Sequence, residues 1–388
     1  MSLLPISLAL LSFLSLTTST PTNLPPPQRN CITLQVPIPV TATNHHYTQP
    51  RIDSTTDAVH WTLNTTTWST PNATSRITGP VPVNQTFSIH AQLCLPSLPS
   101  PRLSTLQILT PGRGFDTRYF DVPFSSYTSA ALDHGYAVLS YDRLGSGASE
   151  KPDAYDVVQV PVHTEILAGL TKLARSGELL TVSKVISATG DAIKGYKPTK
   201  IVHVGHSYGS FLTFNFLYHH GEMSDGAVLT GFIIGTRVGT IDVSHFDHEF
   251  AHPPRFQGYG SGYFVLTGGG NLQKLFFRKG GFDEDAAVRY TEEILQPEAV
   301  GEYASEEQVR VLPLTKFKGP ALLMAGEFDY VLCGGDCRGT VLEEETGALF
   351  PGGAEVYLQP GTGHALTLAR NATGGFEVMF GFLEGRGL

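Results

Sequence analysis

Three residues that lie far apart in the chain could together perform nucleophilic catalysis: Ser207, Asp329 and His364. Ser207 is the centre of a G-x-S-x-G pattern that follows the apolar run at residues 201–204 and opens a stretch with helical spacing. A strand, a sharp turn and a helix form a nucleophile elbow, in which the serine hydroxyl projects from the carboxyl edge of a sheet. The two flanking glycines fit this turn, because a Cβ atom there would collide with the neighbouring strand and helix. An ordinary Gly-rich turn between a strand and a helix is the alternative interpretation.

A serine hydroxyl is a weak nucleophile, so it needs a general base within hydrogen-bond distance. Of the 14 histidines, His364 is the one in a Gly-rich loop after the last strand-like run, which ends at Leu358. His206 is adjacent to the serine, but the side chain at this position of an elbow points elsewhere. We therefore predict that His364 is the base, and a histidine that only packs in its loop is the alternative.

The base needs a carboxylate that orients its ring. Asp329 follows directly after the apolar run at residues 321–324 and is our candidate for this acid. Glu327 and Asp336 compete with it. Asp336 lies in a tight loop between two cysteines, where we expect it to face solvent.

Ester and amide chemistry also needs donors for the oxyanion that forms during attack. We expect the backbone N–H of Tyr208, the residue after the serine, to be one donor. The second should come from the loop at residues 110–115, and we choose the backbone N–H of Arg113. The charged side chain of Arg113 could instead hold this loop through a surface ion pair.

These residues must be positioned by a sheet, and the chain after residue 100 alternates between apolar runs and stretches with helical spacing. Such alternation predicts a mostly parallel sheet that is covered by helices on both faces. Strands are expected at residues 106–109, 137–141, 201–204, 228–234, 321–324 and 355–358, and helices at 125–134, 163–175, 210–219 and 376–383.

The segment at residues 236–317 has no strand-like run and is rich in glycine and aromatic residues. We interpret it as a cap inserted over the sheet rather than as a domain with its own sheet. The core would then consist of residues 21–235 and 318–388, with the acid and the histidine in the second part.

Aromatic residues in the cap could pack onto the core or form an apolar wall over the site. We expect both, and we predict that four aromatic side chains bind the substrate: Phe115, Phe246, Phe250 and Tyr263.

The N-terminus indicates a secreted protein. An apolar run at residues 6–16 is too short to span a bilayer, and small polar residues and a Pro-rich stretch follow it. We predict a signal peptide at residues 1–20, with a buried N-terminal helix as the alternative. Behind it lie four sequons for N-glycosylation, at Asn64, Asn72, Asn84 and Asn371.

The four cysteines are expected to form two disulfides. Cys333 and Cys337 are close enough in sequence to close a tight loop. Cys31 begins one strand-like run (residues 31–37) and Cys94 nearly ends another (residues 86–95), so antiparallel pairing would bring these thiols together.

Composition excludes other classes of protein. The formal net charge is −9, which argues against nucleic-acid binding, and the apolar content of 41% argues against disorder. A helical spacing of His245, His248 and His252 would place them near one face, as in a metal site. A chance polar face of the cap is the more economical interpretation, and we predict no metal and no cofactor.

At these motifs the chain resembles secreted members of the α/β-hydrolase superfamily, close to fungal and actinobacterial serine hydrolases with a cap. The order Ser, Asp, His is typical of that superfamily. The resemblance runs from about residue 85 to the C-terminus, and it is carried by residues 112–121, 135–149, 204–210, 326–329 and 361–364. It implies an α/β-hydrolase fold. Epoxide hydrolases and dehalogenases share this fold but use an aspartate as nucleophile, so Ser207 argues against both.

We therefore expect a secreted, glycosylated, monomeric serine hydrolase without a stable membrane anchor. It would cleave a carboxylic ester of an apolar or aromatic small molecule through an acyl-enzyme. One alternative is a tailoring enzyme of secondary metabolism that acts as a lactonase, acyl transferase or amide hydrolase. The other is a catalytically idle protein that only binds.

Overall fold

The computed structural model describes residues 29–66, 74–189, 195–235, 240–340 and 343–388. The expected signal peptide at residues 1–20 and the sequon at Asn72 lie outside these ranges. No helix in the described ranges is long and apolar enough to cross a membrane.

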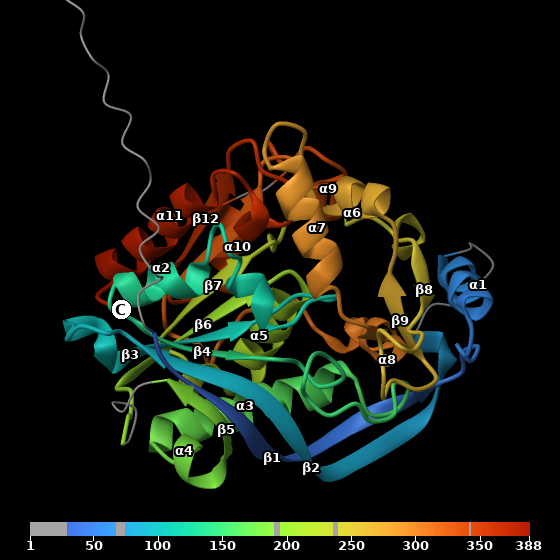
Figure 1. Cartoon of the computed structure of the whole chain (residues 1–388), viewed down its shortest axis with the longest axis horizontal. Helices are drawn as coiled ribbons and strands as arrows, with labels where there is room; N and C mark the ends of the chain where they lie inside the picture. The colour runs from blue at the N-terminus through green and yellow to red at the C-terminus, as the bar shows by residue number, and fades with distance from the viewer. Residues whose placement is uncertain (1–28, 67–73, 190–194, 236–239, 341–342) are drawn as a thin grey trace, which may run out of the picture.

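The described residues form one large sheet with the strand order β12-β11-β7-β6-β3-β4-β2-β1-β5 (Figure 1). Its consecutive strands from β12 to β4 are parallel, whereas β2, β1 and β5 pair antiparallel. The strands span β1 (Asn30–Tyr47), β2 (Ile77–Leu95), β3 (Thr105–Thr110), β4 (Ala137–Tyr141), β5 (Lys184–Thr189), β6 (Lys200–His206), β7 (Gly226–Thr230), β11 (Ala321–Gly326) and β12 (Ala354–Gln359).

The parallel strands are short apolar runs because helices cover both faces of this part of the sheet. Helices α2 and α11 pack together on one face, and α3 packs against α5 on the other (Figure 1). The helices of the core span α2 (Tyr127–Asp133), α3 (Val160–Ser176), α4 (Leu179–Val182), α5 (Tyr208–His220), α9 (Tyr330–Cys333), α10 (Glu343–Leu349) and α11 (Ala372–Gly385). The α/β-hydrolase fold expected from the sequence is therefore confirmed.

The first two strands are much longer than their sequence patterns predict. β1 pairs with β2 from one end to the other, and Cys31 lies opposite Cys94. The strand-like run expected from the sequence ends at Pro37, because proline is rare in the interior of a strand, and Pro39 follows closely. Both prolines are tolerated because β5 pairs only with residues 31–35 of β1, which leaves the backbone beyond on the sheet edge. This extended ribbon runs beneath the insertion and leads to α1 (Thr55–Thr66), which packs against β8 (Figure 1).

The insertion between β7 and β11 lies at the end of the sheet where the parallel strands terminate (Figure 1). The expectation that it contains no strand was wrong, because β8, β9 and β10 form a small antiparallel sheet in the order β10-β9-β8. Strands this short carry no readable alternation in sequence. The elements of the insertion span β8 (His248–Phe250), β9 (Tyr263–Leu266), α6 (Gly269–Phe276), α7 (Glu284–Ile294), β10 (Glu298–Ala299) and α8 (Val300–Ala304).

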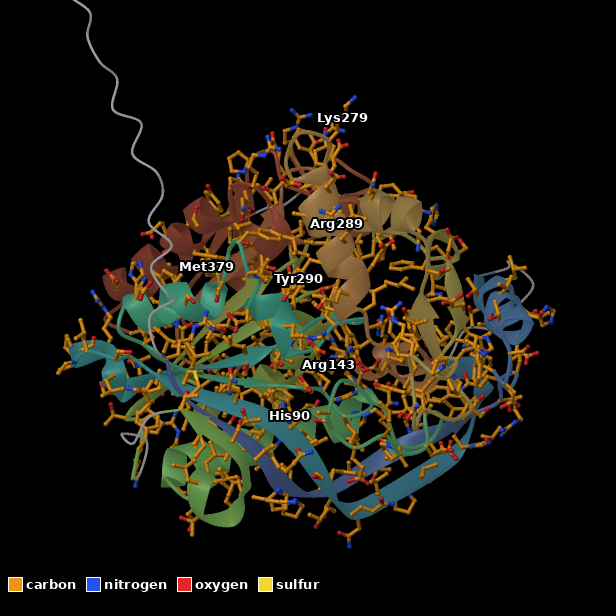
Figure 2. The ribbon with its side chains drawn as sticks, in the orientation of Figure 1. His90, Arg143, Lys279, Arg289, Tyr290 and Met379 are labelled. Carbon is orange, nitrogen blue, oxygen red and sulfur yellow. A yellow bond between two sulfur atoms is a disulfide. The ribbon has the colours of Figure 1, made fainter. Side chains whose placement is uncertain are left out.

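The side chains between the insertion and the sheet are buried even where they are charged. Figure 2 shows Arg143 inside the molecule, whereas Lys279, in the loop between α6 and α7, projects from the surface. Arg143 is 1% exposed and forms an ion pair with Glu302 of α8. A buried ion pair of this kind ties the core to the insertion, because removing either partner would leave an uncompensated charge.

Candidate active site

The turn between β6 and α5 has the strained geometry of a nucleophile elbow. Ser207 has φ 51° and ψ −122°, and it is the one non-glycine residue with a positive φ in the described part of the chain. A Cβ atom on Gly205 would lie 2.5 Å from the Cα of Ser210, and one on Gly209 would lie 2.1 Å from the carbonyl oxygen of Thr110. Only glycine fits at these two positions, which is the reason the sequence pattern needs it.

Three side chains from three different strand ends meet at this turn. The Nε2 atom of His364 lies 2.8 Å from the Oγ of Ser207, and its Nδ1 lies 2.6 Å from an Oδ of Asp329. Asp329 is fully buried, and its second oxygen accepts a hydrogen bond of 2.9 Å from the backbone N–H of Leu332. The carboxylate therefore caps α9 with one oxygen and holds the imidazole with the other.

The two competing acids are engaged elsewhere. Asp336 is exposed and forms an ion pair with Arg338. Glu327 accepts a hydrogen bond of 2.9 Å from the backbone N–H of Gly361, so it braces the loop that carries His364 without touching the ring.

The histidine next to the serine belongs to the core. His206 stacks on Tyr119 with ring centroids 4.2 Å apart, and its Nδ1 lies 3.2 Å from the hydroxyl of Thr230. Burial, together with the nearby ring of His364, lowers the pKa of His206 well below its ordinary value. His206 therefore stays neutral and supports the site from behind.

The loop after β3 lies directly against the serine. A Cβ atom on Gly112 would lie 3.1 Å from the Cβ of Ser207, and the Gly112 carbonyl accepts a hydrogen bond of 3.1 Å from Arg143. Tyr208 is the first residue of α5, where backbone N–H groups have no partner within the helix. The two segments that carry the expected oxyanion donors, the loop at residues 112–113 and the start of α5, therefore both adjoin Ser207.

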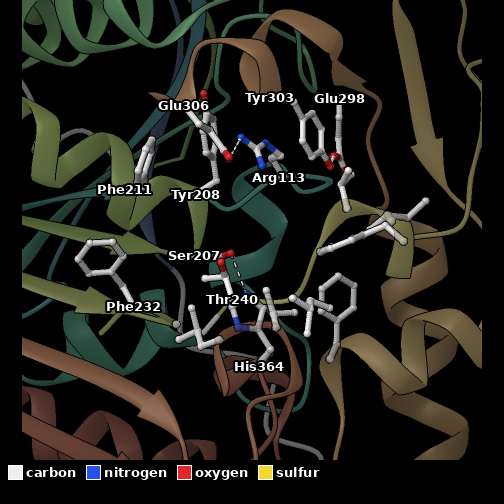
Figure 3. Close-up of a pocket in the computed structure, with 18 of the residues that line it drawn as sticks. Arg113, Ser207, Tyr208, Phe211, Phe232, Thr240, Glu298, Tyr303, Glu306 and His364 are labelled. Carbon is white, nitrogen blue, oxygen red and sulfur yellow. Dashed lines mark hydrogen bonds and ion pairs between the residues drawn. The ribbon is translucent and has the colours of Figure 1, made fainter. Parts of the chain in front are cut away.

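The side chain of Arg113 forms an ion pair, as the alternative considered from the sequence allowed, but the pair is partly buried. Its guanidinium is 3.9 Å from the ring centres of both Tyr208 and Tyr303 and pairs with Glu306 (Figure 3). The pair is partly buried because it belongs to the wall of a cavity and not to the outer surface.

A cavity of about 320 Å³ opens above Ser207 and His364. Most of its wall is apolar, and one side of it, shown in the upper part of Figure 3, carries Arg113, Tyr208, Glu298, Tyr303 and Glu306. Besides the serine and histidine, it is lined by Arg113, Tyr208, Phe211, Gly231, Phe232, Ile233, Thr240, Ile241, Val243, Phe246, Leu266, Phe276, Glu298, Tyr303, Glu306, Val331 and Leu332.

Of the four predicted substrate-binding aromatics, only Phe246 lines this cavity. Phe115 lies behind the wall between the rings of Tyr119 and Phe276, with centroids 5.2 and 5.4 Å away. Its position in the oxyanion loop suggested contact with substrate, but the side chain turns into the core.

The other two predicted aromatics also pack elsewhere. Phe250 packs against a cluster that contains Trp61 and Phe264, and it does not line the cavity. Tyr263 is buried and donates a hydrogen bond of 2.9 Å to the carbonyl of Pro152. Both lie in short strands, whose side-chain direction is set by packing that no sequence period reveals.

Sequence reasoning missed the polar side of the cavity. Glu298 and Glu306 line the cavity, and Glu302 between them pairs with Arg143. The three residues are spaced four apart in the insertion. Burial raises the pKa of Glu298 to about 7. Burial alone would do the same to Glu302, but Arg143 and His163 hold the pKa of that carboxyl down at about 2. The four-residue spacing was the available signal, and it is also typical of an exposed helix face.

The three histidines with apparent helical spacing do not form a metal site. His245 ends a 3₁₀ turn and His248 begins β8, so the spacing is not helical. His248 packs on Phe264 with centroids 4.6 Å apart, and His252 bonds to Thr55. Within the described ranges, no group of three or more His, Cys, Asp or Glu side chains is arranged to hold a metal.

The four cysteines lie in two pairs at disulfide distance, Cys31 with Cys94 and Cys333 with Cys337. Among the sequons, Asn84 and Asn371 are exposed, and Asn64 is half-buried on α1. Glycosylation of these residues stays a prediction.

Comparison with known proteins agrees with this architecture. Residues 107–373 match the alpha/beta hydrolase family, and the chain belongs to that family. A thermophilic esterase from Thermogutta terrifontis has a similar fold, with 14% identity and a TM-score of 0.52 over 78% of this chain and 94% of that chain. An esterase from Exiguobacterium antarcticum also has 14% identity, over 77% of this chain and 96% of that chain, with a TM-score of 0.49. No curated protein matches this chain.

Proposed function

We propose that this chain is a serine hydrolase that cleaves carboxylic esters of small, mainly apolar molecules. The observation that carries the proposal is the continuous hydrogen-bonded chain from Ser207 through His364 to buried Asp329, which opens into an apolar cavity. A nucleophile, a base and an orienting acid in this arrangement are the parts that acyl transfer requires.

The geometry supports a two-step mechanism. His364 Nε2 takes the proton of Ser207 as Oγ attacks the ester carbonyl, and the carbonyl π electrons move onto oxygen. Asp329 stabilises the resulting imidazolium and keeps Nε2 turned toward the serine. When the tetrahedral intermediate collapses, the C–O bond to the alcohol breaks and His364 protonates the leaving oxygen. Water then attacks the acyl-enzyme by the same route and releases the acid and Ser207.

The oxyanion needs two donors while this charge exists. We assign these to the backbone N–H groups of Tyr208 and Arg113. The elbow supplies the first, and the loop that Gly112 presses against Ser207 supplies the second. The side chain of Arg113 contributes indirectly, because its pairing with Glu306 anchors that loop to the cap.

Secretion is part of the proposal. Two cysteine pairs at disulfide distance, an apolar N-terminal run and exposed sequons are together typical of the secretory route. Mass spectrometry of protein secreted by a eukaryotic host would test it through the new N-terminus and glycan masses. An intact Met1 and unmodified asparagines would contradict it.

The reaction is tested with a fluorophosphonate probe and a panel of p-nitrophenyl esters, lactones and anilides. We expect the probe to label Ser207, and we expect esters to be cleaved at least tenfold faster than anilides. Preferred lactone or anilide turnover would instead identify a tailoring hydrolase. Absence of labelling and of turnover would identify a binding protein.

A further inference from the structure

The catalytic cavity contains a carboxyl group with one oxygen left bare. Glu298 is 1% exposed, yet it lines the same cavity as Ser207 and lies on its polar side beside Tyr303 (Figure 3). Its Oε2 accepts a hydrogen bond from the Tyr303 hydroxyl. Its Oε1 is buried and has no hydrogen-bond partner among the described residues.

This bare oxygen lies next to the loop that touches the nucleophile. A Cβ atom on Gly114 would lie 2.9 Å from Glu298 Oε1, while one on Gly112 would lie 3.1 Å from the Cβ of Ser207. Ser207 and Glu298 also line the same cavity of about 320 Å³, so one small molecule can touch both residues.

An unsatisfied buried oxygen is unfavourable by about 1–3 kcal/mol. Such an atom in a native protein calls for an explanation, and a bound molecule that supplies the missing partner is one. Because Glu298 is a residue of the cavity wall, a molecule that occupies the cavity is the nearest source of this partner, and in the proposed reaction that molecule is the ester.

The charges around Glu298 indicate the chemistry of the partner. Arg113 lines the same side of the cavity but is paired with Glu306, so this pair acts only weakly on a charged group there. The ionised Glu298 carboxyl would repel an anionic group, and a cationic group would gain only from that ionised form. A neutral polar group that can bond to both forms of the carboxyl fits best.

The protonation of Glu298 narrows this choice further. Burial raises the pKa of this carboxyl to about 7, so both protonation states are populated near neutral pH. When the carboxyl is ionised, the bare oxygen needs a hydrogen-bond donor. When it is protonated, this oxygen either carries the proton and needs an acceptor, or still needs a donor. A hydroxyl group serves both, because it donates one hydrogen bond and accepts others.

We propose that Glu298 is a specificity-determining residue that binds a hydroxyl group of the substrate, so that hydroxylated esters are preferred over the same esters without the hydroxyl. This inference rests on the proposed ester hydrolysis at Ser207. Sites that hydrogen-bond a substrate hydroxyl discriminate strongly against analogues that lack it, because the buried partner is then left unpaired.

The test uses matched pairs of esters that differ by one hydroxyl on either side of the ester bond. Phenyl acetate is compared with 3- and 4-hydroxyphenyl acetate, and methyl benzoate with methyl 3- and 4-hydroxybenzoate. The ratio of kcat/KM within each pair is measured by chromatography of the products for wild type, Glu298→Gln, Glu298→Leu and Glu293→Gln. Glu293 is an exposed carboxylate of α7 and controls for the loss of a charge on the cap.

We expect wild type and Glu293→Gln to prefer the hydroxylated member of at least one pair by about tenfold or more. Glu298→Gln should keep part of this ratio, because an amide also donates and accepts, whereas Glu298→Leu should bring it close to one. The ratio of kcat/KM within a pair does not change when part of the enzyme is unfolded, because both esters are measured with the same preparation. A purely structural role of Glu298 would therefore leave this ratio unchanged in the variants.

A wild-type enzyme that hydrolyses the plain esters and discriminates within no pair would overturn the proposal without any variant. A preference that survives in Glu298→Leu would do the same. If no ester is cleaved and the fluorophosphonate probe does not label Ser207, the proposed function itself has failed, and this outcome is distinct from the other two.

Discussion

The sulfur of Cys337 lies 4.0 Å from the backbone carbonyl oxygen of Asp329. That carbonyl also accepts hydrogen bonds from the backbone N–H groups of Cys333 and Gly335, at 3.2 and 3.1 Å. Cys337 in turn donates its N–H to the carbonyl of Glu327. The loop closed by Cys333 and Cys337 is therefore wrapped around the residue that holds His364.

From this relationship we predict that the short disulfide matters more for activity than for stability. Replacing Cys333 and Cys337 by serine should lower kcat several-fold, because a triad tolerates only small displacements of its orienting group. The Cys31–Cys94 bridge joins residues 63 positions apart, whereas the Cys333–Cys337 bridge joins residues 4 positions apart. From loop entropy, the first bridge should stabilise the folded chain by about 4 kcal/mol and the second by about half as much.

The double variant Cys31→Ser, Cys94→Ser is the matched control. It should lower the melting temperature more and kcat less than the first double variant. If both pairs affect kcat alike, or if the short pair affects only the melting temperature, the loop is a structural staple with no part in positioning Asp329. Peptide mapping without reduction must first find the two expected pairs.

We predict that Asp329→Asn lowers kcat by about 10⁴-fold while the fold is retained, because the amide favours the wrong tautomer of His364. Asp336→Asn should change kcat less than twofold, since its carboxylate is exposed and paired with Arg338. Steady-state kinetics on one ester compare the two. The reverse pattern would show that Asp336, in the loop between Cys333 and Cys337, is the acid that orients His364.

Two substitutions of Ser207 should separate catalysis from backbone strain. Ser207→Ala and Ser207→Gly should both lower kcat by more than about 10³-fold, because each lacks the nucleophile. Ser207→Gly should unfold at a higher temperature than Ser207→Ala. Glycine adopts φ 51° without the cost of about 1–3 kcal/mol that other residues incur. Calorimetry of both variants measures this. Equal melting temperatures of the two variants would show that the elbow stores no strain. A variant that retains a tenth of the wild-type kcat would show that Ser207 is not the nucleophile.

The carboxyl of Glu298 should make stability depend on pH. Its pKa is raised to about 7 in the folded chain, so below about 4.5 it is protonated whether the chain is folded or unfolded. Between these values the folded chain holds a proton that the unfolded chain releases. The stabilisation from Glu298 is therefore fully present below about pH 4.5 and is lost as the pH rises through 7.

Urea unfolding of wild type and Glu298→Gln between pH 4.5 and 8 measures this contribution. The free energy of unfolding of wild type minus that of the variant should fall by about 3 kcal/mol over the range, since groups such as Arg113 and Glu302 are present in both proteins. A difference that stays constant, or that rises with pH, would show that Glu298 is ionised throughout.

The strand–turn–helix around Ser207 could be predicted from sequence because its pattern is local. Glycine is required at position 205 by the backbone of the turn itself and at position 209 by the backbone of Thr110 at the end of the neighbouring strand, and the apolar run before the turn marks a buried parallel strand. Parallel strands bring their carboxyl ends to one edge, so residues that follow such runs converge there. Asp329 and His364 were identified by this rule, and the distances of 2.6 and 2.8 Å agree with it.

The polar side of the cavity was decided only by the tertiary structure. Whether Phe250 or Glu298 faces Ser207 depends on how short strands and single turns of the cap dock onto the core, and elements of this length have no period that reveals which face is inward. Burial then changes the chemistry: the same residue type has a pKa of about 7 at Glu298 and about 2 at Glu302. The partners that hold the pKa of Glu302 down are more than a hundred residues away in the chain, at Arg143 and His163, and packing alone brings them together.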